Sequence, residues 1–382
     1  MRLDRFGGAL YVPVVTTPTL ESVQQALGAV IDPTFERSLA DLDALSNVEL
    51  DGTKLKTQVR IASPAEQVRK QIRERLNAAV QPLGVTHVEI AWKVQVPKRE
   101  ASAVDPIPDV RNVILIISGK GGVGKSSVAA NLAMSLRRAG TRVGLLDADI
   151  YGPSVPTMLG ISGHPSSKDG KRIIPMQRFG LKMMSIGFLL EDDKQAVVWR
   201  GPMLHGALQQ FIADVDWGEL DYLLIDLPPG TGDVALTLAQ KVKLTGAVVV
   251  TTPQEVALQD VYKSVSMCHK LNIPVLGVVE NMSYYTDSAG VRQELFGAGG
   301  GAKIAEYAKA PLLGQVPLDP KVREWGDAGM PVVQAEPEAP AAQAFALVAD
   351  ALTNHIAAEH FERGAGQQTP TGDKPKKMRI LR

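Results

Sequence analysis

Residues 119–126 read G-K-G-G-V-G-K-S and satisfy the pattern G-x-x-x-x-G-K-[ST] at every fixed position. A continuous apolar run, residues 113–118, comes before them and is typical of a buried parallel strand. Residues 127–136, which follow, have a helical composition and contain no helix breaker. A glycine loop between a strand and a helix presents backbone N–H groups and the helix N-terminus to an anion. The pattern and its flanks together predict a phosphate-binding loop.

Side chains of this loop and of two later strand ends supply further groups that a bound nucleotide needs. Lys125 is expected to reach the β- and γ-phosphates, and the Ser126 hydroxyl to bind Mg²⁺. Asp226 and Asp147 each close an apolar, strand-like run. Because open α/β sheets bind ligands at the carboxyl ends of their strands, we expect Asp226 to hold Mg²⁺ through water and Asp147 to lie near the metal. A helix cap is the alternative role for either carboxylate.

A second lysine, Lys120, directly follows the first glycine of the loop. With it, the loop resembles the deviant Walker A box of the ATPases that include MinD, ParA, the nitrogenase iron protein and the Mrp/ApbC proteins. This resemblance implies that Lys120 reaches across a dimer interface to the partner's nucleotide, and that the active unit is a face-to-face homodimer. It also implies that Asp149 orients or deprotonates the attacking water. The alternatives are a solvated loop lysine for Lys120 and a helix N-cap for Asp149.

Segments outside the loop narrow the resemblance to the Mrp/ApbC proteins, and it covers about residues 20–355. In this class an asparagine after a late strand binds the adenine edge, and Asn281 matches it; a strand-end turn former is the alternative. A segment like 316–318 lines the base. The segments that carry the resemblance are 147–159, 198–203, 217–222, 226–233, 251–254 and 280–284. The predicted catalytic residues are Lys120, Lys125 and Asp149, and the predicted nucleotide-binding residues are Gly119, Lys120, Gly121, Gly122, Val123, Gly124, Lys125, Ser126, Ser127, Asn281 and Pro317.

The chain is long enough for two or three domains, and its patterns change along its length. Apolar runs alternate with helical segments after residue 112, which predicts an α/β fold with a doubly wound, mostly parallel sheet. The preceding part mixes alternating and helical periods and resembles the small α+β domain of iron–sulfur assembly factors. That domain commonly carries a reactive cysteine near the position of Pro64, and none occurs here. The predicted boundaries are an extension 1–18, the small domain 19–96, a linker 97–111, the P-loop ATPase domain 112–360 and a disordered tail 361–382.

Charge and cysteine content limit the classes of partner. Forty-one basic residues balance forty-one acidic ones, so the net charge gives no reason to expect a nucleic acid or a membrane as partner. Residues 1–6 lack the apolar core of a signal peptide, and no apolar run reaches the roughly 18–20 residues of a spanning helix. The single cysteine, Cys268, fits a reducing compartment. We expect a cytoplasmic protein.

The cysteine content also separates this chain from many of the proteins it resembles. Many Mrp/ApbC proteins carry a C-x-x-C pair shortly after the Glu-Asn-Met-Ser-Tyr segment, and two subunits then supply four thiolates to a [4Fe–4S] cluster. Residues 284–297 contain no cysteine here. We predict that Cys268 is a small buried apolar residue.

The resemblance therefore implies an ATP-hydrolysing homodimer that acts with Mg²⁺ in iron–sulfur cluster assembly or transfer to apo client proteins. A cluster is expected as transient cargo only. The alternative is a positioning ATPase of the ParA/MinD type. Zero net charge argues against its DNA-binding form, and the short polar tail after residue 361 argues against a membrane anchor.

Overall fold

The computed structural model describes residues 18–102, 104–149, 152–167, 170–189, 201–230 and 232–367. The expected extension up to residue 17, residues 198–200 of one family-like segment, residue 231 and the tail from residue 368 lie outside the described residues. The chain divides into two compact units. The N-terminal unit comprises Met1–Ile61 and Gln67–Gln95, and the C-terminal unit comprises Ala62–Glu66 and Val96–Arg382.

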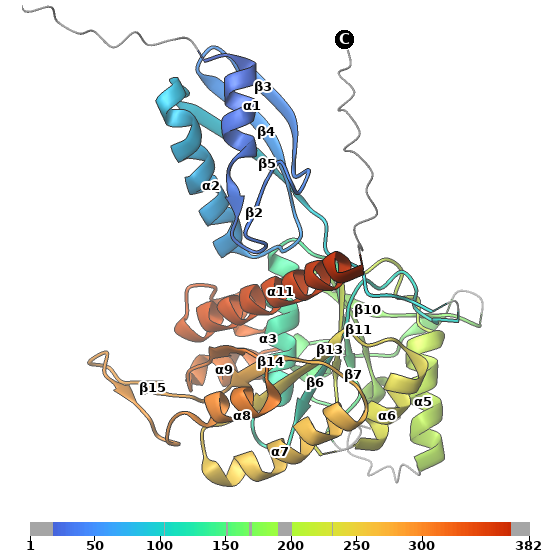
Figure 1. Cartoon of the computed structure of the whole chain (residues 1–382). Coiled ribbons are helices and arrows are strands. Elements are labelled where there is room, and N and C mark those ends of the chain that lie inside the picture. Colours follow the sequence, from blue (N-terminus) through green and yellow to red (C-terminus); the bar gives the residue numbers. More distant parts are fainter. Residues whose placement is uncertain are drawn as a thin grey trace, which may run out of the picture. The chain divides into compact units, whose positions relative to one another are not determined.

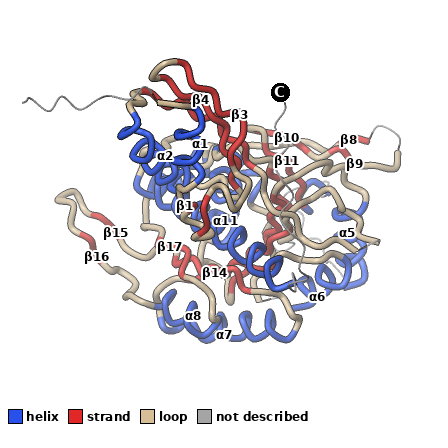
Figure 2. The backbone as a smooth tube through the Cα atoms, turned by 45° about the horizontal axis from the view of Figure 1, so that its top comes forward, coloured by secondary structure: helices blue, strands red, loops and turns tan. Residues whose placement is uncertain are grey.

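The N-terminal unit is a three-stranded sheet with helices packed on its apolar face (Figures 1 and 2). The strands lie in the order β3-β4-β5, with β3 antiparallel and β5 parallel to the central strand. Alternate residues of β4 are buried, and α2 buries one residue per turn: Val68, Ile72, Leu76 and Val80. The elements are α1 (Leu20–Gly28), β1 (Ile31–Asp32), β2 (Arg37–Ser38), β3 (Leu45–Asp51), β4 (Lys54–Ile61), α2 (Glu66–Val80), the 3₁₀ helix η1 (Gln81–Leu83) and β5 (His87–Val94).

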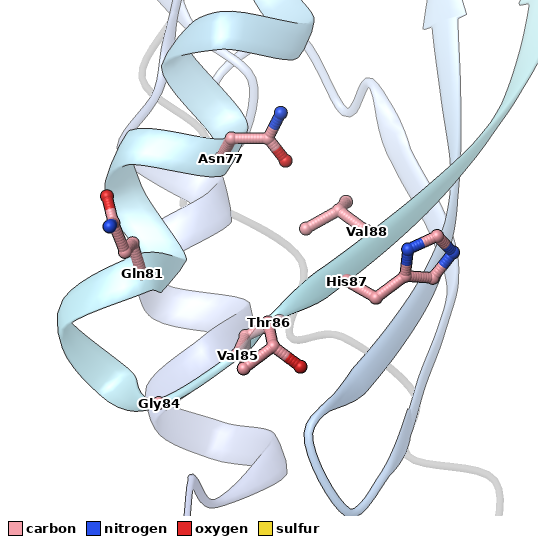
Figure 3. A pocket seen from close by; sticks show the side chains of 7 residues that line it. All are labelled: Asn77, Gln81, Gly84, Val85, Thr86, His87 and Val88. Atoms are coloured by element: carbon pink, nitrogen blue, oxygen red, sulfur yellow. The ribbon is translucent and has the colours of Figure 1, made fainter.

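A hollow of about 540 Å³ lies where the end of α2 turns through η1 into β5 (Figure 3). Amide, hydroxyl, imidazole and apolar groups line it, and none of its lining residues carries a thiol or a carboxylate. It therefore offers no thiolate to a metal. The lining residues are Asn77, Gln81, Gly84, Val85, Thr86, His87 and Val88.

The C-terminal unit is built on an eight-stranded sheet in the order β10-β11-β7-β12-β6-β13-β14-β17. Every neighbouring pair is parallel except β10 with β11, which confirms the predicted doubly wound, mostly parallel sheet. All residues of β6, β7, β12 and β13 are buried, because helices cover both faces. The strands are β6 (Val113–Ser118), β7 (Val143–Asp147), β10 (Met176–Arg178), β11 (Leu181–Ser185), β12 (Tyr222–Asp226), β13 (Gly246–Thr251), β14 (Val275–Glu280) and β17 (Leu312–Gln315).

Helices α5 to α8 pack their apolar faces on one side of this sheet, and α3 and α11 pack on the other (Figure 1). Strands β14 and β17 accordingly lie between α11 and α8 (Figure 2). The helices are α3 (Lys125–Arg138), α4 (Val155–Leu159), α5 (Gly201–Ala213), α6 (Gly232–Lys241), α7 (Glu255–Lys270), α8 (Gly300–Ala308), α9 (Pro320–Asp327), α10 (Val332–Ala335), α11 (Pro340–Gln367) and the 3₁₀ helix η2 (Ile186–Leu189). Short strand pairs are β8 (Ser166–Ser167) with β9 (Ile173–Ile174), and β15 (Tyr285–Thr286) with β16 (Arg292–Gln293). No helix of the described residues is long and apolar enough to cross a membrane.

The segment predicted as a linker is packed into the C-terminal unit by a buried ion pair. Arg99 pairs with Asp105, and both side chains are almost fully buried. Arg99 also donates to the carbonyls of Ile107 and Val110, and the Ile107 N–H donates to Asp105. Burial raises the pKa of Asp105, but the hydrogen bonds from Arg99 and Ile107 outweigh it and the pKa lies below its usual value. The charge of Arg99 and Asp105 suggests a solvated linker, but in the structure these two residues form a buried ion pair with each other.

Helix α11 closes the C-terminal unit. Its apolar residues Phe345, Val348, Leu352 and Ile356 are buried, as expected for a helix docked on the core. The helix continues to Gln367, so residues 361–367 are helical and do not belong to a disordered tail.

Candidate nucleotide-binding site

The glycine loop connects β6, which ends at Ser118, to α3, which begins at Lys125. Two of its glycines leave no room for a side chain. A Cβ on Gly119 would lie 2.4 Å from the backbone nitrogen of Val261. Gly124 has a left-handed backbone, with φ of +78°, and a Cβ there would lie 2.3 Å from Asn281 Nδ2. Glycine is therefore required on steric grounds at both ends of the loop.

Lys125 lies among carboxylates at the carboxyl ends of adjacent strands. Its Nζ donates to Asp226 Oδ1 at 2.6 Å and lies 3.5 Å from Asp149 Oδ2. The three residues are at most 8% exposed. The sheet brings the acidic residues together because Asp226 of β12 pairs in register with Asp147 of β7. The structure thus gathers around one loop four residues from three distant segments of the sequence: Lys125, Asp147 with Asp149, and Asp226.

One carboxylate oxygen of Asp226 is suited to act as a metal ligand. Its Oδ2 atom is buried and has no hydrogen-bond partner among the described residues. Burial raises the pKa of Asp226, against the opposing effects of Lys125 and the nearby Ser126 hydroxyl. A buried carboxylate oxygen beside a serine hydroxyl offers the hard oxygen ligands that Mg²⁺ prefers. These residues fit a Mg²⁺–nucleotide complex.

Asp147 is engaged by donors of the protein itself. Its Oδ1 accepts from the Asp149 N–H at 3.1 Å, and its Oδ2 accepts from the Val155 N–H at 3.2 Å and from Ser185 Oγ at 3.1 Å. Burial and the charge of Asp226 raise the pKa of Asp147 to about 8. In this structure Asp147 fixes the backbone that carries Asp149, and its contact with a metal stays a prediction.

A cavity of about 280 Å³ lies beside the loop on the side of α3. Gly124, Ser127, Asn281 and Pro317 all line it, so residues predicted from separate segments meet at one place. Asn281 Nδ2 donates to the carbonyl of Val123 at 2.9 Å and ties the cavity to the phosphate loop. The remaining lining residues are Ala130, Asn131, Met158, Met282, Leu318, Asp319, Val322, Arg323, Gly326, Asp327 and Pro331.

Sequence reasoning missed the wall formed by α9. Asp319 caps this helix by accepting from the Lys321 N–H at 2.9 Å, and Pro320 occupies its first position. Asp-Pro is a helix-start signal that the sequence displays. Arg323 and Asp327 of the same helix pair at 3.0 Å along the cavity wall, and no sequence motif marks them.

Lys120 and Cys268 differ sharply in exposure. The Lys120 residue is partly exposed, its carbonyl accepts from Ser118 Oγ at 3.1 Å, and no described carboxylate forms an ion pair with its side chain.

Cys268 of α7 is fully buried, as predicted. Burial raises the pKa of the Cys268 thiol to about 12, so the thiolate form that binds metals is disfavoured.

The glycine loop, the strand-end carboxylates and the parallel sheet define a P-loop NTPase, an enzyme that hydrolyses ATP. The model of the NUBPL iron-transfer P-loop NTPases matches residues 109–353, and that of the iron–sulfur cluster assembly proteins matches residues 20–91. The chain belongs to the NUBPL iron-transfer P-loop NTPase family.

Similar proteins agree with this membership. The iron–sulfur cluster carrier protein of Deinococcus radiodurans is 47% identical over 339 residues, which are 88% of this chain and 95% of that protein. The carrier protein of Synechocystis is 43% identical over 351 residues, 88% of this chain and 98% of that one. A nucleotide-binding protein of Archaeoglobus fulgidus, solved in complex with ADP, is 41% identical with a TM-score of 0.52 over 59% of this chain and 88% of that chain.

Proposed function

We propose that this protein is an ATP-driven homodimeric factor that assembles iron–sulfur clusters or transfers them to apoproteins, and that it holds no stable cluster of its own. The observation that carries the proposal is that the chain has the side chains for a nucleotide site but lacks accessible thiols for an iron–sulfur cluster. The groups predicted to bind phosphate, metal and base surround the glycine loop, whereas the single thiol, Cys268, is fully buried. The single cysteine also supports a reducing compartment such as the cytoplasm.

In this proposal the chain's own residues divide the work of ATP hydrolysis. Lys125 moves from Asp226 to the phosphates, which bring their own negative charge to the loop. Ser126 and, through water, Asp226 would hold Mg²⁺, which would supply neutralising charge to the phosphates. Asp149, held by Asp147, orients the attacking water. Lys120 of the partner subunit completes the charge around the transferred phosphoryl group.

The proposal treats the cluster as cargo. Curated relatives are named iron–sulfur cluster carrier proteins. A [4Fe–4S] cluster normally takes four thiolates, and a dimer of this chain contains two cysteines, both buried. The hairpin of β15 and β16 carries an acid, Asp287, but its oxygens accept from the Ala289 and Val291 N–H groups and from Gln293 Nε2. Cluster ligands would therefore come from a client or a partner protein.

Anaerobic reconstitution with iron and sulfide tests the proposal. We expect ATP hydrolysis, no stoichiometric [4Fe–4S] signal on the purified dimer, and cluster transfer to an apo client that depends on ATP when a cluster donor is present. The matched control is Cys268→Ser, which should hydrolyse ATP at the parent's rate. A stable cluster near one per dimer, lost in Cys268→Ser, would contradict the cargo model, and the absence of ATP hydrolysis would contradict the enzyme.

A further inference from the structure

Glu280, the last residue of β14, is a fully buried acid outside the predicted set of site residues. Three hydrogen-bond donors converge on its carboxyl group. Its Oε1 accepts from Ser283 Oγ at 2.5 Å and from Gln315 Nε2 at 2.7 Å, and its Oε2 accepts from the Gly301 N–H at 2.6 Å. A buried carboxylate is tolerated only when such donors replace water. This pocket is therefore built around an acceptor with two oxygens.

A carboxylate satisfies all three donors at once. A glutamine would keep every contact only if the Ser283 hydroxyl and a flipped Gln315 amide became acceptors for its NH₂ group. Gly301 stands in the first turn of α8, where the helix dipole also favours a negative charge. A Cβ on Gly301 would lie 2.8 Å from the Cβ of Glu280, so the helix approaches as closely as glycine permits.

Two of the three donors belong to segments that form walls of the 280 Å³ cavity beside the phosphate loop, which we call the base cavity. Ser283 lies in the segment of Asn281, and Gln315 comes just before the segment of Pro317. Backbone bonds join the same two segments: the Val316 N–H donates to the Glu280 carbonyl, and the Ser283 N–H donates to the Val316 carbonyl, both at 2.9 Å. The Glu280 carboxylate thus links both wall segments of the cavity to the first turn of α8 through its three hydrogen bonds.

We propose that Glu280 is a positioning residue for the nucleotide base: it sets the separation of Asn281 and Pro317 without touching the ligand. This inference rests on the proposed nucleotide site. It predicts a selective defect, because the Glu280 carboxylate supports the base cavity and, among the described residues, forms no hydrogen bond with the phosphate loop. Base recognition should weaken while phosphate recognition stays.

The test compares two ligands on the full chain by titration calorimetry in the presence of Mg²⁺. For Glu280→Gln we expect the affinity for ADP to fall about tenfold, since the charge is lost and Ser283 and Gln315 must either reverse their hydrogen bonds or lose them. The affinity for inorganic pyrophosphate should stay within about twofold of the parent's. The matched control is Asp32→Asn, which alters another buried acid, located in the N-terminal unit, and should change neither affinity.

Ser283→Ala provides a milder variant that removes one donor and keeps the carboxylate; it carries the test if Glu280→Gln does not fold. We expect it to lose ADP affinity about threefold and to keep pyrophosphate affinity. Unchanged ADP affinity in the folded variants, or an equal loss for both ligands, would overturn the positioning role. A parent protein that binds pyrophosphate but not ADP, or neither ligand, would overturn the proposed nucleotide function and this inference with it.

Discussion

Lys125 and Asp226 form a direct ion pair of 2.6 Å, with the carboxylate fully buried. The cation predicted to bind phosphate and the carboxylate predicted to bind Mg²⁺ therefore neutralise one another in this structure. A Mg²⁺–nucleotide complex offers each of them a new partner of the opposite charge. The pair explains how both charges tolerate burial in a site that must open to a polyanion.

Lys125→Ala should abolish ATP binding and hydrolysis, lowering affinity at least about a hundredfold, since the loop loses its phosphate-paired charge. It should also lower the free energy of unfolding by about 3–5 kcal/mol, because Asp226 is left buried without its partner. Nucleotide titration and chemical denaturation measure the two effects. The double variant Lys125→Ala/Asp226→Asn should recover much of the stability and none of the binding. Parent-like ATP affinity in Lys125→Ala would refute the assignment of the loop.

Lys120→Ala should separate binding from turnover. If Lys120 acts across a dimer, the variant binds ATP normally and hydrolyses it at least about tenfold more slowly. Mixed dimers of a Lys120→Ala subunit and an Asp149→Ala subunit should regain one working site in two, because the second subunit supplies an intact Lys120 to the first. A mixed dimer as inactive as both homodimers would rule out action across the interface.

The Cys268 thiol should resist alkylation in the native protein. Its pKa is raised to about 12 by burial, so between pH 7 and 9 the reactive thiolate is scarce as well as shielded. We expect labelling by iodoacetamide at least about a hundredfold slower than for the chain in denaturant. The rate can be followed by mass spectrometry. Rapid native labelling at pH 8 would show that α7 opens and would reinstate Cys268 as a candidate cluster ligand.

The Arg99–Asp105 pair should stabilise the C-terminal unit above the pH at which free aspartate titrates. Asp105→Asn leaves Arg99 buried without its charge partner, and the free energy of unfolding should fall by about 3 kcal/mol at pH 7. Because the folded pKa of Asp105 lies below the ordinary 3.8, the contribution is present above that value and is lost as pH falls through the folded pKa. The difference from the parent should therefore shrink below about pH 4. A difference independent of pH would show that packing, not charge, is what the variant lost.

Local sequence patterns predict the central sheet well. The apolar runs at β6, β7, β12, β13 and β14 become buried strands because each is covered on both faces. The side-chain ion pairs and hydrogen bonds between residues cannot be predicted from local sequence patterns. Arg99 and Asp105 have the composition of a solvated linker, yet they pair in the core. Ser63 bonds Thr353 at 3.0 Å, a partner 290 positions later that no local pattern indicates.

The candidate site also contains residues that the sequence predicts directly and residues that it does not. The phosphate loop and Asp226 follow from their own residues, whereas Asn281 and Pro317 are predicted only through the resemblance to a family. Glu280 lies in the family-like segment 280–284, but no pattern there indicates its role, because two of its three donors come from other segments of the chain.

The hydrogen bond from Asn281 to the Val123 carbonyl fixes the distance between the base cavity and the phosphate loop. In the proposed site this bond joins the residue predicted to bind the adenine edge to the loop predicted to bind the phosphates, so it fixes the distance between the two subsites. The site would then select a ligand by the distance between its base and its phosphates as well as by the chemistry of those two groups. A nucleoside with one phosphate, or a base on a longer spacer, could fill either end of the site but not both at once.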